Sequence, residues 1–270
     1  MTIKKIIATD MDGTFLREDH TFDKDRLRRV LDQFQQAGYL FVAASGRSLP
    51  SLKMVFEGFE EEMAFVAENG AIVTYGHQEI YIDDPIAPEV YMKLVNDLVA
   101  SGYAQPHHIT LSGIQQSYML KTIEKDLFKD LSGYYLSIGL VDDFSQVEED
   151  IIKLNVFFDE AIRDEAQDWI NNNFDNLTAV TTGFTSVDII LSGVHKAFGL
   201  EKLCQHFGLT KDDVIAFGDN QNDVEMLEFA GLSLVTSNAQ PTAKAVADKM
   251  IGHCNDDAVL EYMEDLVNGY

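Results

Sequence analysis

Two aspartates near the start of the chain have the type and spacing for cation or acid–base chemistry. Asp10 and Asp12 directly follow an apolar run, Ile6-Ile7-Ala8-Thr9, and precede Gly13-Thr14. In an extended backbone, side chains alternate between two faces, so residues two apart point the same way. Two carboxylates side by side repel each other and need a cation, a proton or water. The sequence therefore predicts a site that binds a cation or a proton at the end of the first strand.

Two other apolar runs also end in polar residues. Ser45-Gly46 follows Tyr39 to Ala44, and the segment Gly218 to Asp223 follows Val214 to Phe217. In an open parallel sheet, ligands bind beyond the carboxyl ends of the strands, so these three groups are expected at one edge. Each group alone has a simpler interpretation: a solvated turn, a plain turn, or aspartates that cap the next helix. Their shared position at strand ends favours a common site.

The surrounding pattern predicts the elements that hold this site. Strand and helix patterns alternate from the first residues to about Asp83 and again beyond His195, which indicates a parallel sheet with right-handed crossovers. Between them, helical patterns are grouped with hairpin-like strands. We therefore expect an α/β fold with a Rossmann-like parallel-sheet core, residues 1–82 and 188–270, interrupted by an inserted α+β domain, residues 83–187.

Composition restricts the partners. The chain has 270 residues and a formal charge of -25, which repels nucleic-acid backbones and anionic membrane surfaces. We expect a small-molecule partner, no nucleic acid and no membrane, and the sequence is silent on the oligomeric state. An apolar leader or membrane-length segment is not found before the first strand, and Cys204 and Cys254 fit reduced thiols, so we expect a cytoplasmic location.

The order of these motifs resembles the haloacid dehalogenase superfamily of phosphohydrolases, in its Cof-type branch with a large cap. The first motif of that family, Asp-x-Asp-Gly-Thr, matches Asp10–Thr14, and the second matches Ser45. The third matches Lys196 in "SGVHKAFGL", and the fourth, Gly-Asp-x-x-Asn-Asp, matches Gly218–Asp223. "AENGA" at 67–71 is also typical of the branch.

The chain departs from the pattern of this branch at two places. Ser237 in "TSNA" and Ala197 after the lysine stand where glycine is common. Neither departure removes a functional group.

The resemblance implies a role for each matching residue. Asp10 is the expected nucleophile, and Asp12 the acid that protonates the leaving oxygen and then activates water; a neighbouring carboxylate would raise the pKa of that acid. Mg²⁺ is the implied cofactor, held by the side chains of Asp10 and Asp219 and the backbone carbonyl of Asp12. Asp223 would orient a metal-bound water or Lys196. The implied phosphate-binding groups are the backbone N–H groups of Met11 and Gly46, the Ser45 hydroxyl, the Lys196 ammonium and the Asn222 amide.

The inserted domain would act as the family's cap, a lid that selects the leaving group, with hinges near Asp83-Asp84 and Ser186-Val187. The resulting expectation is a Mg²⁺-dependent phosphatase for small phosphorylated metabolites. By resemblance, sugar phosphates are the first substrate class to expect. Two alternatives stay open. A metal-dependent glycosyltransferase would not need Lys196, and a sugar-phosphate-binding regulator would not need both Asp10 and Asp12.

Overall fold

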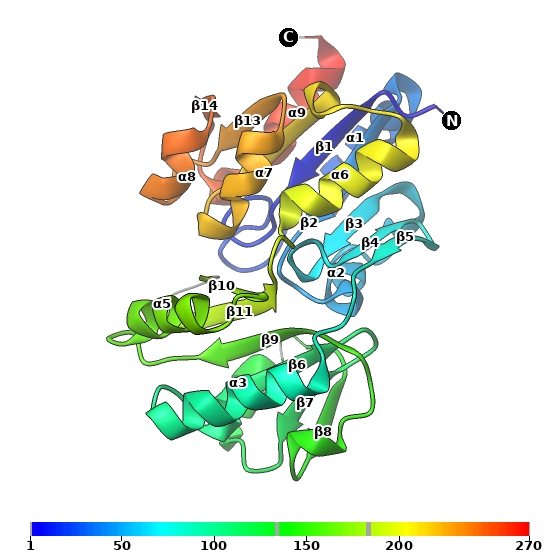
Figure 1. Ribbon diagram of the computed structural model, residues 1–270. Helices are drawn as coiled ribbons and strands as arrows, with labels where there is room; N and C mark the ends of the chain where they lie inside the picture. The colour runs from blue at the N-terminus through cyan, green and yellow to red at the C-terminus, as the bar shows by residue number, and fades with distance from the viewer. Residues whose placement is uncertain (1, 133–134, 182–184, 270) are drawn as a thin grey trace. The chain divides into compact units, whose positions relative to one another are not determined.

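A computed structural model of the chain describes residues 2–132, 135–181 and 185–269 (Figure 1). These residues form two compact units. The first unit comprises the chain up to Ser45, Val55–Ile82 and the residues from His195 onward. The second comprises Gly46–Met54 and Asp83–Val194.

The first unit is built on a mixed sheet, which among the described residues has eight strands in the order β14-β13-β12-β1-β2-β3-β4-β5. Neighbours from β14 to β3 are parallel, whereas β4 and β5 add an antiparallel edge. The expected α/β fold with a parallel-sheet core is confirmed. The strands are β1 (Lys5–Thr9), β2 (Tyr39–Ala44), β3 (Ala64–Ala67), β4 (Ile72–Tyr75), β5 (Gln78–Ile82), β12 (Val214–Gly218), β13 (Leu232–Val235) and β14 (Lys249–Met250).

Helices cover both faces of this sheet, as Figure 1 shows. Helices α6 (Lys196–Phe207) and α7 (Val224–Phe229) pack on one face, where Leu40 and Val42 of β2 join their apolar cluster. Helices α1 (Lys24–Ala37) and α9 (Ala258–Asn268) lie on the other face, and α8 is Pro241–Val246. Phe41, between Leu40 and Val42, instead contacts aromatic rings that include Phe15. Successive side chains of β2 thus pack into apolar cores on opposite faces of the sheet. This packing holds the strand in place, and with it the strand's carboxyl end.

The second unit carries its own sheet, in the order β10-β11-β9-β6-β7-β8. Its neighbours are antiparallel except for β7 and β8. One face packs apolar residues against α3 and α5, whereas the other face carries buried polar residues, described below. The elements are α2 (Leu49–Val55), α3 (Pro88–Ser101), β6 (Ile109–Gly113), β7 (Ser117–Leu120), α4 (Lys125–Leu131), β8 (Ile138–Val141), β9 (Ile151–Phe157), α5 (Arg163–Asn173), β10 (Leu177–Thr181) and β11 (Ser186–Leu191).

The limits of the two units differ from the expected limits at two places. The boundary expected at 187/188 falls inside β11, which pairs with β10 and β9, so the second unit continues to Val194. Both Ser186 and Val187 take part in this strand pairing, and a hinge near them stays a prediction. In addition, Gly46–Met54 is grouped with the second unit and not with the first. The other limit, between Ile82 and Asp83, coincides with the expected one.

Within the described residues, none of the helices combines the length and the apolar character that crossing a bilayer requires. The two cysteines are buried and free. Burial raises the pKa of the Cys204 thiol to about 11.

Candidate active site

The chain turns immediately after Asp10. The Asp10 N–H still donates to the carbonyl of Phe217 on β12 (2.9 Å), but Phe15 N–H then donates to the Asp10 carbonyl and Leu16 N–H to that of Met11. The extended backbone on which a common direction of Asp10 and Asp12 depends therefore ends at Asp10. Asp10 is buried, 6% exposed, whereas the Asp12 side chain is 42% exposed and lies 3.0 Å from Nδ1 of His20.

Gly13 allows this turn to approach β12. Its φ is +84°, and a Cβ at this position would lie 2.5 Å from Oδ2 of Asp219. A residue with a side chain would therefore meet both backbone strain and a clash. Thr14, the next residue, donates from Oγ1 to Oδ1 of Asp219 (2.8 Å). Gly13 thus lets the turn lie close to Asp219, and Thr14 orients the Asp219 carboxylate through a hydrogen bond.

Lys196 is the first residue of α6 and is fully buried. Its ammonium donates to Oδ1 of Asp10 and, at 2.7 Å, to Oδ1 of Asp223. Asp223 in turn accepts from the N–H groups of Asp219 and Asn220 through Oδ2 (2.9 and 3.0 Å). One lysine therefore joins the aspartate after β1 to the segment after β12, as the common strand-end position predicts.

Burial strongly perturbs these groups. It raises the pKa of Asp10 well above its usual value, although the charge of Lys196 opposes this. Burial also raises the pKa of Asp219 to about 7, with a further contribution from the charge of Asp223. For Lys196, burial lowers the pKa, but the charges of Asp10 and Asp223 outweigh it and raise the pKa above its ordinary value. The lysine therefore stays charged, and it is shared among several carboxylates.

The donor set fits a divalent cation. One carboxylate oxygen from each of Asp10, Asp219 and Asp223 lies within 4.8 Å of the other two. Oxygen atoms of carboxylates are the ligands that Mg²⁺ prefers, and this cluster places two buried carboxylates and the half-buried Asp219 beside one ammonium. This cluster contains Asp223 in place of the Asp12 side chain. Only the backbone carbonyl of Asp12, and not its side chain, was expected to bind the metal, so this cluster does not contradict that expectation.

A turn after β3 ties the remaining polar groups together. Ser45 is buried at the end of β2, and its carbonyl accepts from the N–H of Asn69 (3.0 Å). Asn69 also accepts, through Oδ1, from Nδ2 of Asn222 (3.3 Å). The "AENG" segment thus links two of the predicted phosphate-binding residues. Met11 is fully buried, and Gly46, in the second unit, accepts from the ammonium of Lys153 through its carbonyl.

Sequence reasoning missed several residues around this site. Thr236 and Asn238 both donate to the carbonyl of Gly13 (3.1 and 2.7 Å), so "TSNA" holds the turn that carries Asp12. His20, which lies beside Asp12, sits in a short polar turn without any periodic signal. Thr14 could have been noticed, because a threonine two residues after a carboxylate in a tight turn is a ready hydrogen-bond donor.

In the second unit, the polar residues of β9 were also missed. Lys153 and Asn155 are buried, on the face of the sheet opposite to α3 and α5. Lys153 forms an ion pair with Asp188 of β11 (3.2 Å), and Asn155 donates to the same carboxylate (2.7 Å). The available signal was a lysine and an asparagine two apart inside an otherwise apolar run.

Comparisons with known proteins identify the family of the chain. The family described as haloacid dehalogenase-like hydrolase matches residues 7–263. The chain is 31% identical over 264 residues to the 5-amino-6-(5-phospho-D-ribitylamino)uracil phosphatase YbjI of Escherichia coli (strain K12), covering 97% of this chain and 96% of the relative. It is 25% identical over 277 residues to the phosphatase of the same description, YitU, of Bacillus subtilis (strain 168), covering 96% of each chain.

A solved structure is similar over the whole chain. The crystal structure of SMU.1108c from Streptococcus mutans UA159 superimposes with a TM-score of 0.92 at 31% identity. The similarity covers 99% of this chain and 100% of the other. The expected resemblance is thus confirmed over the full length of the fold.

Proposed function

We propose a specific activity for this chain on the premise that it belongs to the haloacid dehalogenase-like hydrolase family, in its Cof-type branch. The chain is a phosphatase of this family, of the class that acts on small phosphorylated metabolites. Within that class, we assign a Mg²⁺-dependent hydrolysis of phosphate monoesters through a phosphorylated Asp10. The observation that carries this assignment is the buried Lys196, which joins Asp10 to Asp223.

Asp10 and Asp12 divide the chemistry between them. An Oδ of Asp10 attacks phosphorus, the ester P–O bond breaks, and the departing oxygen takes a proton from the Asp12 carboxyl. Asp12 then removes a proton from water, whose oxygen attacks phosphorus. The bond between Asp10 and phosphorus breaks, which releases phosphate and restores both carboxyl groups. The separate environments of the two side chains support this division, because Asp10 is buried and Asp12 is partly exposed.

The remaining groups neutralise and hold the phosphoryl oxygens. Lys196 supplies a fixed positive charge, and Ser45, Asn222 and the N–H groups of Met11 and Gly46 supply hydrogen bonds. Mg²⁺, held by Asp10, Asp219 and the Asp12 carbonyl, would supply charge that offsets the repulsion between a carboxylate and a phosphate dianion. Asp223 would keep Lys196 oriented. The three neighbouring carboxylates support the metal assignment.

We further propose that the substrate is a phosphorylated sugar or sugar alcohol and that the second unit selects it. The names of two relatives specify a 5-phospho-D-ribitylamino group, which is a phosphorylated sugar alcohol. The buried polar residues of the second sheet support a role in binding hydroxyl groups, since Oδ1 of Asn155 is buried and has no hydrogen-bond partner among the residues that the structure describes. The cytoplasmic location stays a prediction from the sequence.

The test is phosphate release from a panel of metabolite phosphates, with Mg²⁺ and with chelator. The panel would include a ribitylaminouracil phosphate, hexose phosphates, flavin mononucleotide and pyridoxal phosphate. Asp10→Asn should abolish release, whereas Asp32→Asn, an exposed aspartate of α1, should not. If Asp10→Asn retains turnover, or if chelator has no effect, the assignment fails. If no substrate turns over and both proteins bind sugar phosphates equally, the regulator alternative replaces it.

A second readout follows the covalent intermediate directly. An Asp12→Asn variant should still accept phosphate from p-nitrophenyl phosphate, whose leaving group needs little protonation, but should hydrolyse the intermediate slowly. Intact-protein mass spectrometry should then detect one added phosphoryl group. The added mass should be absent from the Asp10→Asn, Asp12→Asn double variant. Its presence there would place the nucleophile elsewhere.

A further inference from the structure

The side chain of Asp12 is in contact with a histidine that none of the motifs contains. Nδ1 of His20 lies 3.0 Å from Oδ1 of Asp12, and the two side chains are 51% and 42% exposed. The two residues are separated by a turn, so this contact depends on the conformation of residues 13–19.

The backbone at His20 is in the left-handed region, with φ of +61°. The turn closes through hydrogen bonds from His20 N–H to the Arg17 carbonyl (2.8 Å) and from Arg17 N–H to the Thr21 carbonyl (3.0 Å). Left-handed backbone costs free energy at any residue with a Cβ, although histidine tolerates it better than most. An ion pair between exposed side chains, in contrast, contributes little to stability. The free energy that the contact between His20 and Asp12 contributes to folding therefore does not explain the strained backbone at His20.

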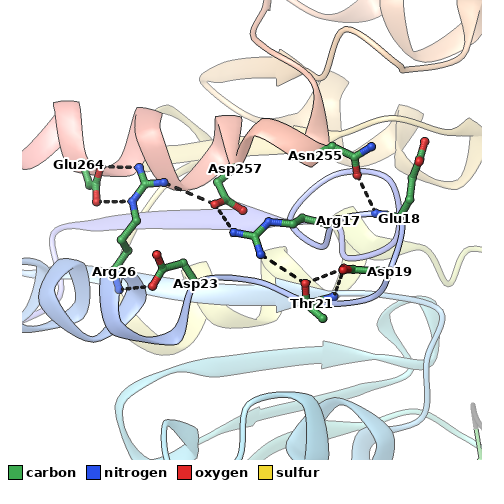
Figure 2. A network of polar contacts seen from close by, with 9 residues as sticks. All are labelled: Arg17, Glu18, Asp19, Thr21, Asp23, Arg26, Asn255, Asp257 and Glu264. Carbon is green, nitrogen blue, oxygen red and sulfur yellow. Dashed lines mark hydrogen bonds and ion pairs between the residues drawn. The ribbon is translucent and has the colours of Figure 1, made fainter.

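This turn is fastened to the C-terminal part of the chain, as Figure 2 shows. Arg17 forms an ion pair with Asp257, the residue before α9, and Glu18 N–H donates to Oδ1 of Asn255 (2.9 Å). Arg26 of α1 contacts the same Asp257 carboxylate (3.5 Å) and forms a second ion pair with Glu264 (2.6 Å). The position of His20 is thus fixed by contacts that do not involve Asp12.

The backbone beside Asp12 is also fixed. Thr236 and Asn238 both donate to the carbonyl of Gly13. Both ends of the Asp12–His20 contact therefore have independent supports. A pair held in this way sets the direction of one carboxyl oxygen of Asp12.

We propose that His20 is a positioning residue that holds the Asp12 carboxyl in the orientation from which it protonates the leaving oxygen. This inference rests on the proposed function, since it acts through the acid role of Asp12. The contact with His20 is made by Oδ1, and Oδ2 is the oxygen that we assign to the proton transfer. Orientation of a reacting group is a large part of general-acid catalysis, so loss of this contact slows proton transfer without changing phosphate binding.

The test compares substrates whose leaving groups need different amounts of protonation. An alkyl phosphate needs a full proton from the acid, whereas p-nitrophenyl phosphate needs little. We expect His20→Ala to lower kcat about tenfold for the alkyl ester and less than about twofold for the aryl ester, with KM unchanged. The matched control is His77→Ala, because His77 is an exposed histidine that also pairs with a carboxylate, Glu61.

Three other replacements separate the side chain from the backbone. Asparagine presents an N–H at the position of Nδ1 and tolerates positive φ, so His20→Asn should restore kcat to within about threefold of the parent. Glutamine places its amide one bond farther, so His20→Gln should resemble His20→Ala. Glycine relaxes the backbone strain but supplies no donor, so His20→Gly should also resemble His20→Ala.

Equal losses on both esters, or parental rates on both, would overturn the inference while leaving the proposed function intact. Parental activity in His20→Gly would also overturn it, because the backbone alone would then suffice. If the parent protein hydrolyses neither ester with Mg²⁺ present, the proposed function fails and this inference fails with it. The pattern of leaving-group dependence therefore distinguishes the two failures.

Discussion

The backbone of Gly70 lies directly against the carbonyl group of His195. Gly70 has a φ of +110°, and a Cβ built there would overlap that carbonyl. His195 caps α6, its Nδ1 accepting the N–H of Phe198 (3.1 Å), and Lys196 follows it as the first helical residue. The turn after β3 is therefore packed against the backbone that positions the buried lysine.

Replacing Gly70 with alanine should displace the start of α6. We expect Gly70→Ala to lower the free energy of unfolding by about 2 kcal/mol or more, because strain and overlap both act. Phosphatase activity should fall as well. Gly58→Ala is the control, because Gly58 has a similar φ of +88° but open space around it, and should cost only about 1 kcal/mol. Equal effects in chemical denaturation would mean that the contact with His195 does not matter.

Lys196→Met should damage both stability and activity. It leaves the buried carboxylates of Asp10 and Asp223 without their ammonium partner, at a cost of about 3–5 kcal/mol in the metal-free protein. Loss of a charge aimed at the phosphoryl group should lower kcat by roughly 10²-fold or more. Added Mg²⁺ should restore part of the stability, and Lys211→Met, at an exposed lysine, should change neither quantity. Wild-type turnover by Lys196→Met would remove the lysine from the proposed mechanism.

The stability of the metal-free protein should fall as the pH rises through neutrality. The pKa of Asp219 is raised in the folded protein from 3.8 to about 7, so between these values the folded state binds more protons than the unfolded state. Its contribution is full below the lower pKa and is lost as the pH rises through about 7. Urea denaturation with chelator should show this decline, and Asp219→Asn should reduce its slope. A slope identical in Asp219→Asn would contradict the assignment.

Thr14→Val should weaken metal binding while changing stability little. The substitution keeps the shape of the side chain but removes the hydrogen bond to Oδ1 of Asp219. Groups that orient a metal ligand usually contribute 10-fold or more to affinity, so the Mg²⁺ concentration for half-maximal activity should rise about tenfold. The free energy of unfolding should change by about 1 kcal/mol. Thr178→Val, which loses an exposed contact in the second unit, provides the comparison; an equal Mg²⁺ dependence in both variants would argue against the role of Thr14.

Local patterns predicted the strands that carry the site, because the ends of a strand can be recognised from the residues of that strand alone. The run from Tyr39 to Ala44 matches the observed bounds of β2, and α1 begins after Asp23 and ends before Gly38, as capping chemistry predicts. Ser45 and Asp219 were found for the same reason, since each follows such a strand, whereas Lys196 was identified through the resemblance to the family. Their roles in binding and catalysis stay predictions.

Features that depend on distant contacts were not predicted. The turn after Asp10 is supported by Gly13 against Asp219, some two hundred residues later, and so no local rule reveals the conformation of this turn. Similarly, the pairing of β11 with β9 and β10, which moves the limit of the second unit, joins segments that are apart in sequence and is not a local feature. His20 was missed because a single left-handed residue in a polar turn has no periodicity.

The residues that flank the second unit touch each other. The ring of Tyr81 in β5 meets that of Phe198 in α6 edge to face at 5.4 Å, and the ammonium of Lys202 lies over both rings. For the first unit, the intervening chain is therefore a loop whose ends are already closed, and closing a loop costs little more as it lengthens. Such a junction allows the inserted segment to be exchanged for another of different size while the catalytic scaffold keeps its own folding energetics. An exchange of this kind would leave the aspartates and Lys196 of the first unit unchanged.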